Sequence, residues 1–302
     1  MRRKIGLCVL LAAAALLTGC AVRQGGSTAN AGASEGLNGD ELRIAATSPA
    51  VMTICERLDL PLVGVPTSSL TEVPERYRDA TELGSPMSPD MEILKSLSPD
   101  WVLSPSSLQS DLQPKYEEAG LNYAFLNLKS VPGMYKSIEE LGALFGKEAE
   151  AQAQIDEYTA LYEELEASHE GKEGPTVLLL MGIPGSYIVA TENSYAGSLV
   201  ELAGGRNVYA GTDQEFLSVN TEDMLEKDPD VILRTAHALP EQVMEMFAEE
   251  FETNDIWKHF TAVQEGRVYD LTAGYFGMSA TFDYVDALEE LDEIFYAQED
   301  DA

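Results

Sequence analysis

Short apolar runs separated by helical patterns repeat along most of the chain. The runs that predict β-strands are residues 43–47, 62–66, 101–105, 123–128, 176–181, 231–234 and 267–271. Strands that alternate with helices are typical of βαβ units, which form parallel sheets. The alternation stops after the fourth run and restarts with the fifth. We therefore expect an α/β protein with two Rossmann-like lobes and mainly parallel sheets.

One long helix is predicted between the two groups of strands. Residues 148–170 contain neither Gly nor Pro. Their apolar positions follow the i, i+3, i+7, i+10 spacing of an amphipathic helix: Ile155, Tyr158, Tyr162 and Leu165. At 1.5 Å per residue this helix is about 34 Å long, which suits a bridge between two lobes. The predicted division is an N-terminal lobe at 41–132, a linking helical segment at 133–173 and a C-terminal lobe at 174–302.

A helix-to-strand unit occurs once in each predicted lobe. Glu92 lies seven residues before a Pro-Asp pair that leads into the strand at 101. Glu222 lies at the same distance before a second Pro-Asp pair, which leads into the strand at 231. Pro-Asp is also ordinary turn chemistry, so a chance match is the alternative. The match favours two lobes of similar construction.

The N-terminus has the pattern of an export signal. Three basic residues at 2–4 precede an apolar run at 5–17. The run is shorter than the about 20 residues that a membrane-spanning helix needs. It ends in Leu17-Thr18-Gly19-Cys20, which resembles the lipobox of bacterial lipoproteins. That resemblance implies a signal peptide at 1–19 and a lipid on Cys20; an ordinary secretory signal is the alternative.

The acidic composition limits the kinds of partner that the protein can bind. The chain has 19 basic and 52 acidic residues, so its net charge is 19 − 52 = −33. Such a charge disfavours nucleic acid and anionic membranes as partners, so the lipid has to hold the protein at the membrane. Residues 20–40 are rich in Gly, Ala, Ser and Asn, as in a flexible tether that starts at the lipidated cysteine. With residues 1–19 removed and Cys20 lipidated, Cys55 is the one cysteine left, which excludes a disulfide framework. We expect Cys55 to be a small buried hydrophobic residue.

Together these features resemble the substrate-binding lipoproteins of bacterial ABC importers for cobalamin, siderophores and haem. Within that group the chain is most similar to the haem-binding lipoproteins of iron-regulated surface determinant systems. Two segments carry this similarity, residues 84–92 and the stretch from His237 through 239–243 to 254–260. In that family a Met and a His, one from each lobe, are the axial ligands of haem iron. The resemblance therefore implies Met87 and His237 as ligands.

The resemblance also implies how the protein is used. It implies a lipid-anchored monomer, and not an enzyme, on the outer face of the cell membrane. This monomer would carry haem, iron protoporphyrin IX, to the permease dimer of an ABC transporter for iron acquisition. Glu92 and Glu222 match the family's two docking glutamates, which meet arginines of the permease. A carboxylate near a helix start is also favoured by the helix dipole, so capping is the alternative for either one.

Met87 and His237 have suitable features of their own. Ser88 and Pro89 suit an N-cap and a first helical position, so Met87 should project from a rigid loop at the mouth of a helix. His237 follows the strand at 231–234, at the carboxyl edge where α/β sheets place ligands. Taken alone, a loop Met is usually packing material. An imidazole and a thioether together suit a flat iron macrocycle and do not suit zinc or calcium.

Other candidates are weaker. We expect His169 and His259 to be solvated or packed, since both lie in predicted helices. Five residues after predicted strands are compatible with lining the cleft, although core packing explains each of them equally well: Ser48, Met52, Tyr275, Phe276 and Met278.

Three alternatives to haem carriage stay open. A siderophore or cobalamin fits the same fold, although anionic siderophores usually need several cations and the candidate loops offer little beyond Arg234. A bilobal α/β enzyme is disfavoured because the sequence has no G-x-S-x-G, P-loop, G-x-G-x-x-G, C-x-x-C or H-E-x-x-H motif. An adhesive surface lipoprotein would not need the pair of Met87 and His237.

Overall fold

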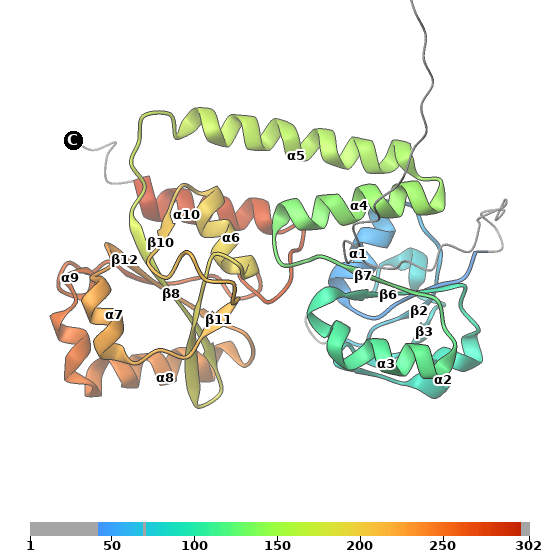
Figure 1. Ribbon diagram of the computed structural model, residues 1–302, viewed down its shortest axis with the longest axis horizontal. Coiled ribbons are helices and arrows are strands. Elements are labelled where there is room, and N and C mark those ends of the chain that lie inside the picture. Colours follow the sequence, from blue (N-terminus) through green and yellow to red (C-terminus); the bar gives the residue numbers. More distant parts are fainter. Residues whose placement is uncertain (1–41, 69–70, 297–302) are drawn as a thin grey trace, which may run out of the picture. The chain divides into compact units, whose positions relative to one another are not determined.

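A computed structural model describes residues 42–68 and 71–296, which form two β-sheets flanked by helices (Figure 1). The predicted signal peptide, Cys20 and the tether lie outside the described residues. Within the described ranges, no helix combines the length and the apolar character that crossing a membrane requires.

The first sheet is parallel throughout and has the strand order β3-β2-β1-β6-β7. Its strands are β1 (Ile44–Ala46), β2 (Leu62–Val65), β3 (Thr81–Glu82), β6 (Trp101–Pro105) and β7 (Tyr123–Leu126). Its helices are α1 (Pro49–Arg57), α2 (Met91–Leu97) and α3 (Gln109–Ala119), with short 3₁₀ turns η1 (Glu75–Tyr77) and η2 (Ser106–Leu108). A separate two-stranded hairpin consists of β4 (Gly84–Ser85) and β5 (Ser88–Pro89). Each of the first four predicted strands corresponds to a strand of this sheet.

The second sheet is mixed. Its order is β11-β9-β8-β12-β13, with β10 also pairing β8. The strands are β8 (Thr176–Ile183), β9 (Ser186–Ala190), β10 (Arg206–Asn207), β11 (Phe216–Leu217), β12 (Val231–Ala236) and β13 (Val268–Asp270). Its helical elements are α6 (Tyr195–Leu202), α7 (Thr221–Lys227), α8 (Pro240–Thr253), η3 (Asp255–His259) and α9 (Thr261–Gln264). Strand β9 turns back antiparallel on β8, and the three strands predicted from the sequence, β8, β12 and β13, pair in parallel.

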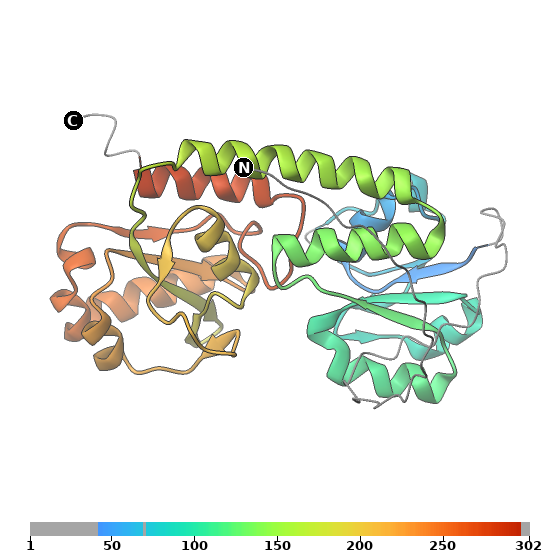
Figure 2. The ribbon, with the colours of Figure 1, turned by 45° about the horizontal axis from the view of Figure 1, so that its top comes forward.

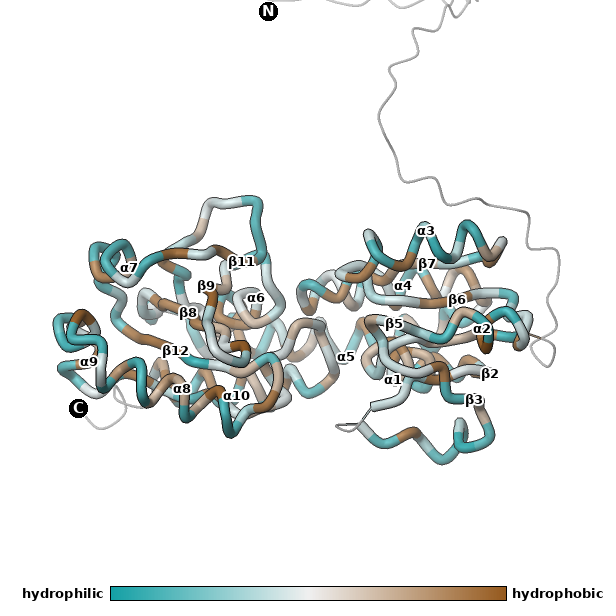
Figure 3. The backbone as a smooth tube through the Cα atoms, turned by 90° about the horizontal axis from the view of Figure 1, so that it is seen from below, coloured by the Kyte–Doolittle hydropathy of each residue, from teal (hydrophilic) through white to brown (hydrophobic). Residues whose placement is uncertain are grey.

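Alternate residues of the central strands pack into different hydrophobic clusters. In β8, Val177 and Leu179 belong to one cluster, whereas Leu178 and Leu180 belong to another. This is the period of two expected for a strand that is covered on both faces. In Figure 3 the colours along α8 alternate between hydrophobic and hydrophilic, as they do in a helix that covers a sheet with one face only. Cys55 is fully buried, as predicted, and burial raises the pKa of its thiol to about 12.

The predicted long helix is α5 (Glu148–Ser168), and it follows α4 (Val131–Phe145) closely. Gly146 ends α4 in the left-handed conformation, which turns the chain back so that α5 packs along α4. In Figures 1 and 2, α5 also runs beside α10 (Tyr284–Tyr296). Tyr135 of α4 stacks on Tyr158 of α5 with 4.5 Å between the ring centroids, and its hydroxyl lies 3.1 Å from that of Tyr284. Three tyrosines thus connect these helices.

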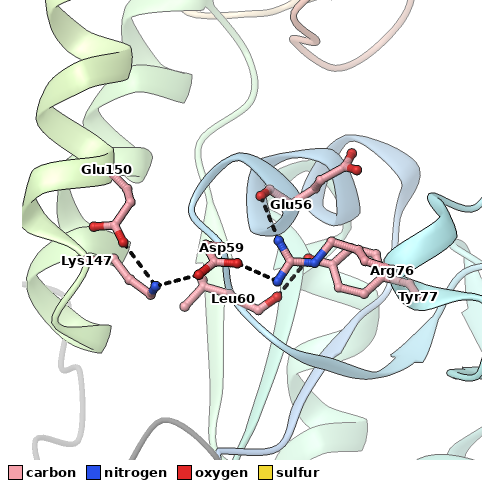
Figure 4. Close-up of polar contacts among 7 residues, drawn as sticks. All are labelled: Glu56, Asp59, Leu60, Arg76, Tyr77, Lys147 and Glu150. Carbon is pink, nitrogen blue, oxygen red and sulfur yellow. Dashed lines mark hydrogen bonds and ion pairs between the residues drawn. The ribbon is translucent and has the colours of Figure 1, made fainter.

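A polar cluster holds the loop before β3 against the start of α5 (Figure 4). The Arg76 guanidinium donates to Asp59 at 2.7 Å, and Lys147 donates to the other oxygen of Asp59 at 3.1 Å. Lys147 also donates to Glu150 at 3.0 Å. The hydrogen bonds from Lys147 and then Arg76 lower the pKa of Asp59. The exposed carboxylate therefore stays ionised and keeps both cations in place.

The repeated helix-to-strand unit is present in both sheets. Helices α2 and α7 each have seven residues, an Asx N-cap and a left-handed C-cap, Ser98 in one and Asp228 in the other. A Pro-Asp pair then leads from each helix into β6 or β12. The similar capping shows that the sequence match between these two segments is also a structural match.

Candidate ligand-binding site

Met87 lies at the tip of the β4–β5 hairpin. Ser85 pairs with Ser88, so Pro86 and Met87 are the two turn residues between them. Proline presets the backbone angle of the first turn position, which makes the hairpin stiff. The hairpin is tied to the carboxyl end of β2, because the Thr67 N–H donates to the Gly84 carbonyl at 2.9 Å. The Met87 side chain is 71% exposed, so its thioether is available to a ligand.

The local structure around Met87 differs from the prediction in one respect. Ser88 and Pro89 belong to β5, and Asp90 is the N-cap of α2. The Asp90 carboxylate accepts the N–H groups of Glu92 and Ile93 at 2.9 and 3.0 Å. The predicted N-cap at Ser88 is therefore wrong, because the carboxylate two residues later satisfies two free N–H groups at once.

His237 follows the last residue of β12. Its backbone N–H donates to the carbonyl of Gly182 at 3.0 Å, which fixes the start of the loop against β8. Its imidazole is exposed. Met87 and His237 therefore lie at the carboxyl ends of the two sheets, where α/β folds commonly bind ligands.

The loop after β13 is tied to the same end of β12. The Thr235 hydroxyl donates to the Phe276 carbonyl at 3.2 Å. Phe276 is buried, whereas Tyr275 and Met278 are half-buried and pack on the core. In the first sheet, Met52 is fully buried and the Ser48 hydroxyl accepts the Val51 N–H as the N-cap of α1. Ser48, Met52 and Phe276 thus have structural roles, and the two half-buried residues are the better placed of the five for contact with a ligand.

Arg234 is already paired. Its guanidinium donates to both carboxylate oxygens of Asp270, at 2.6 and 2.8 Å. It also lies over the rings of Phe247 and Phe251, with 5.6 and 4.7 Å to the ring centroids. The Asp270 carboxylate neutralises the guanidinium charge, which weakens its attraction for an anionic ligand.

The two remaining histidines have local explanations. His169 caps the end of α5, and its Nε2 lies 2.7 Å from Asp292 of α10. Its ring packs on Tyr296 with 4.7 Å between centroids. His259 is an exposed residue at the end of η3. His169 is therefore packed and His259 exposed, and each histidine is in one of the two settings expected for both.

A cavity of about 830 Å³ is lined by Tyr162 and Glu166 of α5 and by residues within 127–132 and 192–215. Neither Met87 nor His237 lines it. Its acidic lining residues are Glu166, Glu192, Glu201, Asp213 and Glu215. Burial and then the neighbouring charge of Glu192 raise the pKa of Glu201. Lys129 also lines the cavity but is paired with Glu215, so the lining keeps a negative charge and does not suit a ligand with carboxylate groups.

Glu92 and Glu222 are both exposed and lie in the first turns of α2 and α7. The two helices have the same length and the same types of cap, so each sheet presents its glutamate in the same local setting.

The sequence patterns do not single out Leu239, the N-cap residue of α8. This leucine is two residues after His237 and is 53% exposed. Its backbone has φ 48° and ψ 59°, in the left-handed region. Leucine directly before a proline that starts a helix is visible in the sequence, but that pair does not predict a left-handed backbone.

Comparison with known proteins gives consistent matches. The family model for periplasmic binding proteins matches residues 44–275. The high-affinity heme uptake system protein IsdE of Staphylococcus aureus is 41% identical over 291 residues, which cover 96% of this chain and 97% of that protein. A crystal structure of an ABC transporter substrate-binding protein from Listeria monocytogenes EGD-e matches with a TM-score of 0.81 and 47% identity. The match covers 85% of this chain and 99% of the Listeria chain.

The crystal structure of S. aureus IsdE complexed with heme matches with a TM-score of 0.79 and 43% identity, over the same shares of both chains. The vitamin B12 binding protein BtuF of Vibrio cholerae, at 19% identity and a TM-score of 0.66, shares the fold alone. These relatives are binding and uptake proteins, not enzymes.

Proposed function

The chain belongs to the periplasmic binding protein family, and from that premise we propose that it captures haem and delivers it to the permease of an ABC importer. The observation that carries the proposal is the similarity to IsdE, which extends over nearly the whole chain and includes a structure solved with heme. As a family member, the protein is a solute-binding protein and not an enzyme, as predicted.

Met87 and His237 are the proposed axial ligands. Both side chains are exposed, and both lie on anchored loops at the carboxyl ends of their sheets. A thioether is a soft, neutral donor and an imidazole is a stronger one. This pair holds iron in a macrocycle at a higher potential than two histidines would.

Haem is favoured over an anionic siderophore because of Arg234. An anionic chelate needs cationic partners, and the Arg234 guanidinium is already held by Asp270. A porphyrin instead presents a large apolar surface, which suits a site with exposed apolar side chains.

The cellular setting follows from the N-terminal pattern and the family. We place the protein outside the cell membrane, held by a lipid on Cys20, as a monomer that meets a permease dimer. The permease contacts are proposed at Glu92 and Glu222.

Mixing the purified protein with haemin tests this proposal. We expect one haem per chain and the visible spectrum of a six-coordinate, low-spin complex, since two axial donors leave no position open for water. His237→Ala should lose more affinity for ferric haem than Met87→Ala, because imidazole is the better donor to Fe(III).

The matched controls are His259→Ala, which removes an exposed histidine outside the loop, and Met246→Ala on α8. Both should keep the wild-type spectrum. A high-spin spectrum, or an absent Soret shift with haemin, would contradict the haem proposal. A six-coordinate spectrum that persists in either axial variant would remove that residue from the ligand set. Cobalamin and a ferric siderophore serve as competing ligands.

A further inference from the structure

Leu239 has an unusual backbone for its residue type. The non-glycine residues with positive φ in the described ranges are Asp59, Ser98, Asp228 and Leu239. The first three are short polar residues, which tolerate this region best, and two of them end helices α2 and α7, where it is common. Leu239 is a branched apolar residue at the start of a helix, where no side chain caps the backbone. The left-handed conformation therefore destabilises the folded protein more with leucine at this position than it would with glycine or asparagine.

The Leu239 side chain does not recover this cost through burial. It is 53% exposed, and Met87 is 71% exposed. These are the two highest values among the large hydrophobic residues that the structure describes as exposed; the others, Val73, Leu144 and Tyr162, reach 36–37%. The two most exposed apolar side chains thus lie on the two loops that carry the proposed axial ligands.

The loop that carries Leu239 is fixed at both ends. The His237 N–H bonds to Gly182, and the Leu239 carbonyl accepts the Val243 N–H at 3.1 Å. Val243 and Phe247 below it are fully buried. The core thus anchors this helix start while the leucine side chain stays outside. Strained residues that the surrounding structure holds in place often mark functional positions.

We infer that Leu239 is a ligand-contact residue, which packs its side chain on the apolar porphyrin surface beside His237 and keeps water away from the bond between the imidazole and iron. This inference rests on the proposed function. It would explain why a strained and exposed apolar residue is held beside His237. A contact between Leu239 and the permease is the competing explanation, and proximity to His237 favours the ligand.

The test measures how fast the haem-loaded protein loses haem to excess apomyoglobin. Leu239→Ala, Leu239→Gly and Leu239→Asn should lose haem about tenfold faster than wild type, since the exposed part of one leucine accounts for roughly one tenfold step in affinity. Leu239→Met keeps an apolar cover and should stay within about twofold of wild type. Leu144→Ala, an exposed leucine on α4, is the matched control and should change nothing.

Thermal unfolding of the haem-free variants reports the strain separately. Leu239→Gly and Leu239→Asn should melt a few degrees above Leu239→Ala, because they adopt left-handed backbone more easily. A lower melting temperature for Leu239→Gly than for Leu239→Ala would overturn the assignment of strain.

The retention results decide the inference itself. Wild-type haem retention in Leu239→Ala would overturn it, and combined with reduced haem uptake by cells it would assign Leu239 to the permease instead. Haem loss from Leu239→Met that is as fast as from Leu239→Ala would also overturn the inference. If the wild-type protein binds no haemin, the proposed function fails and this inference fails with it. If the wild-type protein binds haemin and Leu239→Ala loses haem at the wild-type rate, only the inference fails.

Discussion

Asp100 and Asp230 form matching hydrogen bonds between strands in the two sheets. The Asp100 carboxylate accepts the Arg43 N–H at 2.8 Å, directly before β1. The Asp230 carboxylate accepts the N–H of Thr176 at 2.8 Å and its hydroxyl at 2.6 Å, at the start of β8. Each aspartate thus joins the start of its own strand, β6 or β12, to the first strand of the same sheet. The repeated unit includes this strand contact as well as the helix before it.

Asp230→Ala should lower the free energy of unfolding by about 1 kcal/mol at pH 7. Hydrogen bonds to a charged group contribute about 1.5–3 kcal/mol, and partial exposure reduces this. The Thr176 hydroxyl and then its N–H lower the pKa of Asp230. The stabilisation is therefore present above the pKa of an unfolded aspartate, about 3.9, and is lost as the pH falls through the lower folded value.

Urea unfolding at pH 7 and pH 3 checks this prediction. The gap between wild type and Asp230→Ala should shrink at the lower pH. Asp79→Asn, at an exposed aspartate, is the control and should have little effect at either pH. A gap of equal size at both pH values would show that the ionised carboxylate is not the stabilising species.

At the scale of elements, the close packing of α4 on α5 depends on Gly142. A methyl group on this glycine would lie 2.6 Å from the Ala151 Cβ and 3.1 Å from the Lys147 carbonyl oxygen. Neither neighbour is the end of a flexible side chain, so the helices would have to separate. The absence of a Cβ therefore sets the distance between the two helices, although glycine is a poor helix former.

Gly142→Ala should destabilise the protein by about 1 kcal/mol. Alanine gains about 1 kcal/mol of helix propensity over glycine, but overpacking costs roughly 1–3 kcal/mol and outweighs that gain. The reciprocal double variant Gly142→Ala with Ala151→Gly should recover part of the lost stability, because the propensity changes cancel and the contact with the Ala151 Cβ is removed, whereas the contact with the Lys147 carbonyl remains. Chemical denaturation of the wild type, both single variants and the double variant measures the coupling. Additive single effects would mean that these two positions do not limit the packing.

At the scale of the whole molecule, the matching helices α2 and α7 present one exposed glutamate each. Charge-assisted contacts between such glutamates and arginines of a partner are worth about 1.5–3 kcal/mol each. A helix start also favours a carboxylate, by roughly 0.3–1 kcal/mol. Stability measurements therefore cannot separate docking from capping, whereas transport can.

Glu92→Lys combined with Glu222→Lys should leave haem binding unchanged and abolish haem-dependent growth through the cognate permease. If the proposed docking is right, the reversed charges would repel permease arginines while leaving Met87 and His237 unchanged. The control is Glu118→Lys with Glu252→Lys, which changes the net charge equally at two other exposed glutamates. Uptake at the normal rate in the Glu92 and Glu222 double variant would assign both residues to their helix starts alone.

Local pattern was enough to predict most of the fold. The seven predicted strands and the long helix all correspond to elements of the structure, with α5 ending two residues earlier than expected. Periods of two and 3.6 residues arise from the backbone geometry of each element, so near neighbours in the sequence carry them. The match between Glu92 and Glu222 was visible for the same reason, since it is a spacing along the chain. The site was a different case: Met87 and His237 came from family resemblance, and their ligation of iron stays a prediction.

The tertiary structure decided what depends on distant partners. The pairing of Arg234 with Asp270 and the burial of Met52 and Phe276 each involve groups far apart in sequence. Asp90, not Ser88, caps α2 because β4 pairs with β5 and places Ser88 in a strand. Leu239 is left-handed in a loop that is anchored at Gly182 on one side and by the packed residues of α8 on the other. The free energy of such contacts depends on spatial neighbours, which no local spacing along the chain specifies.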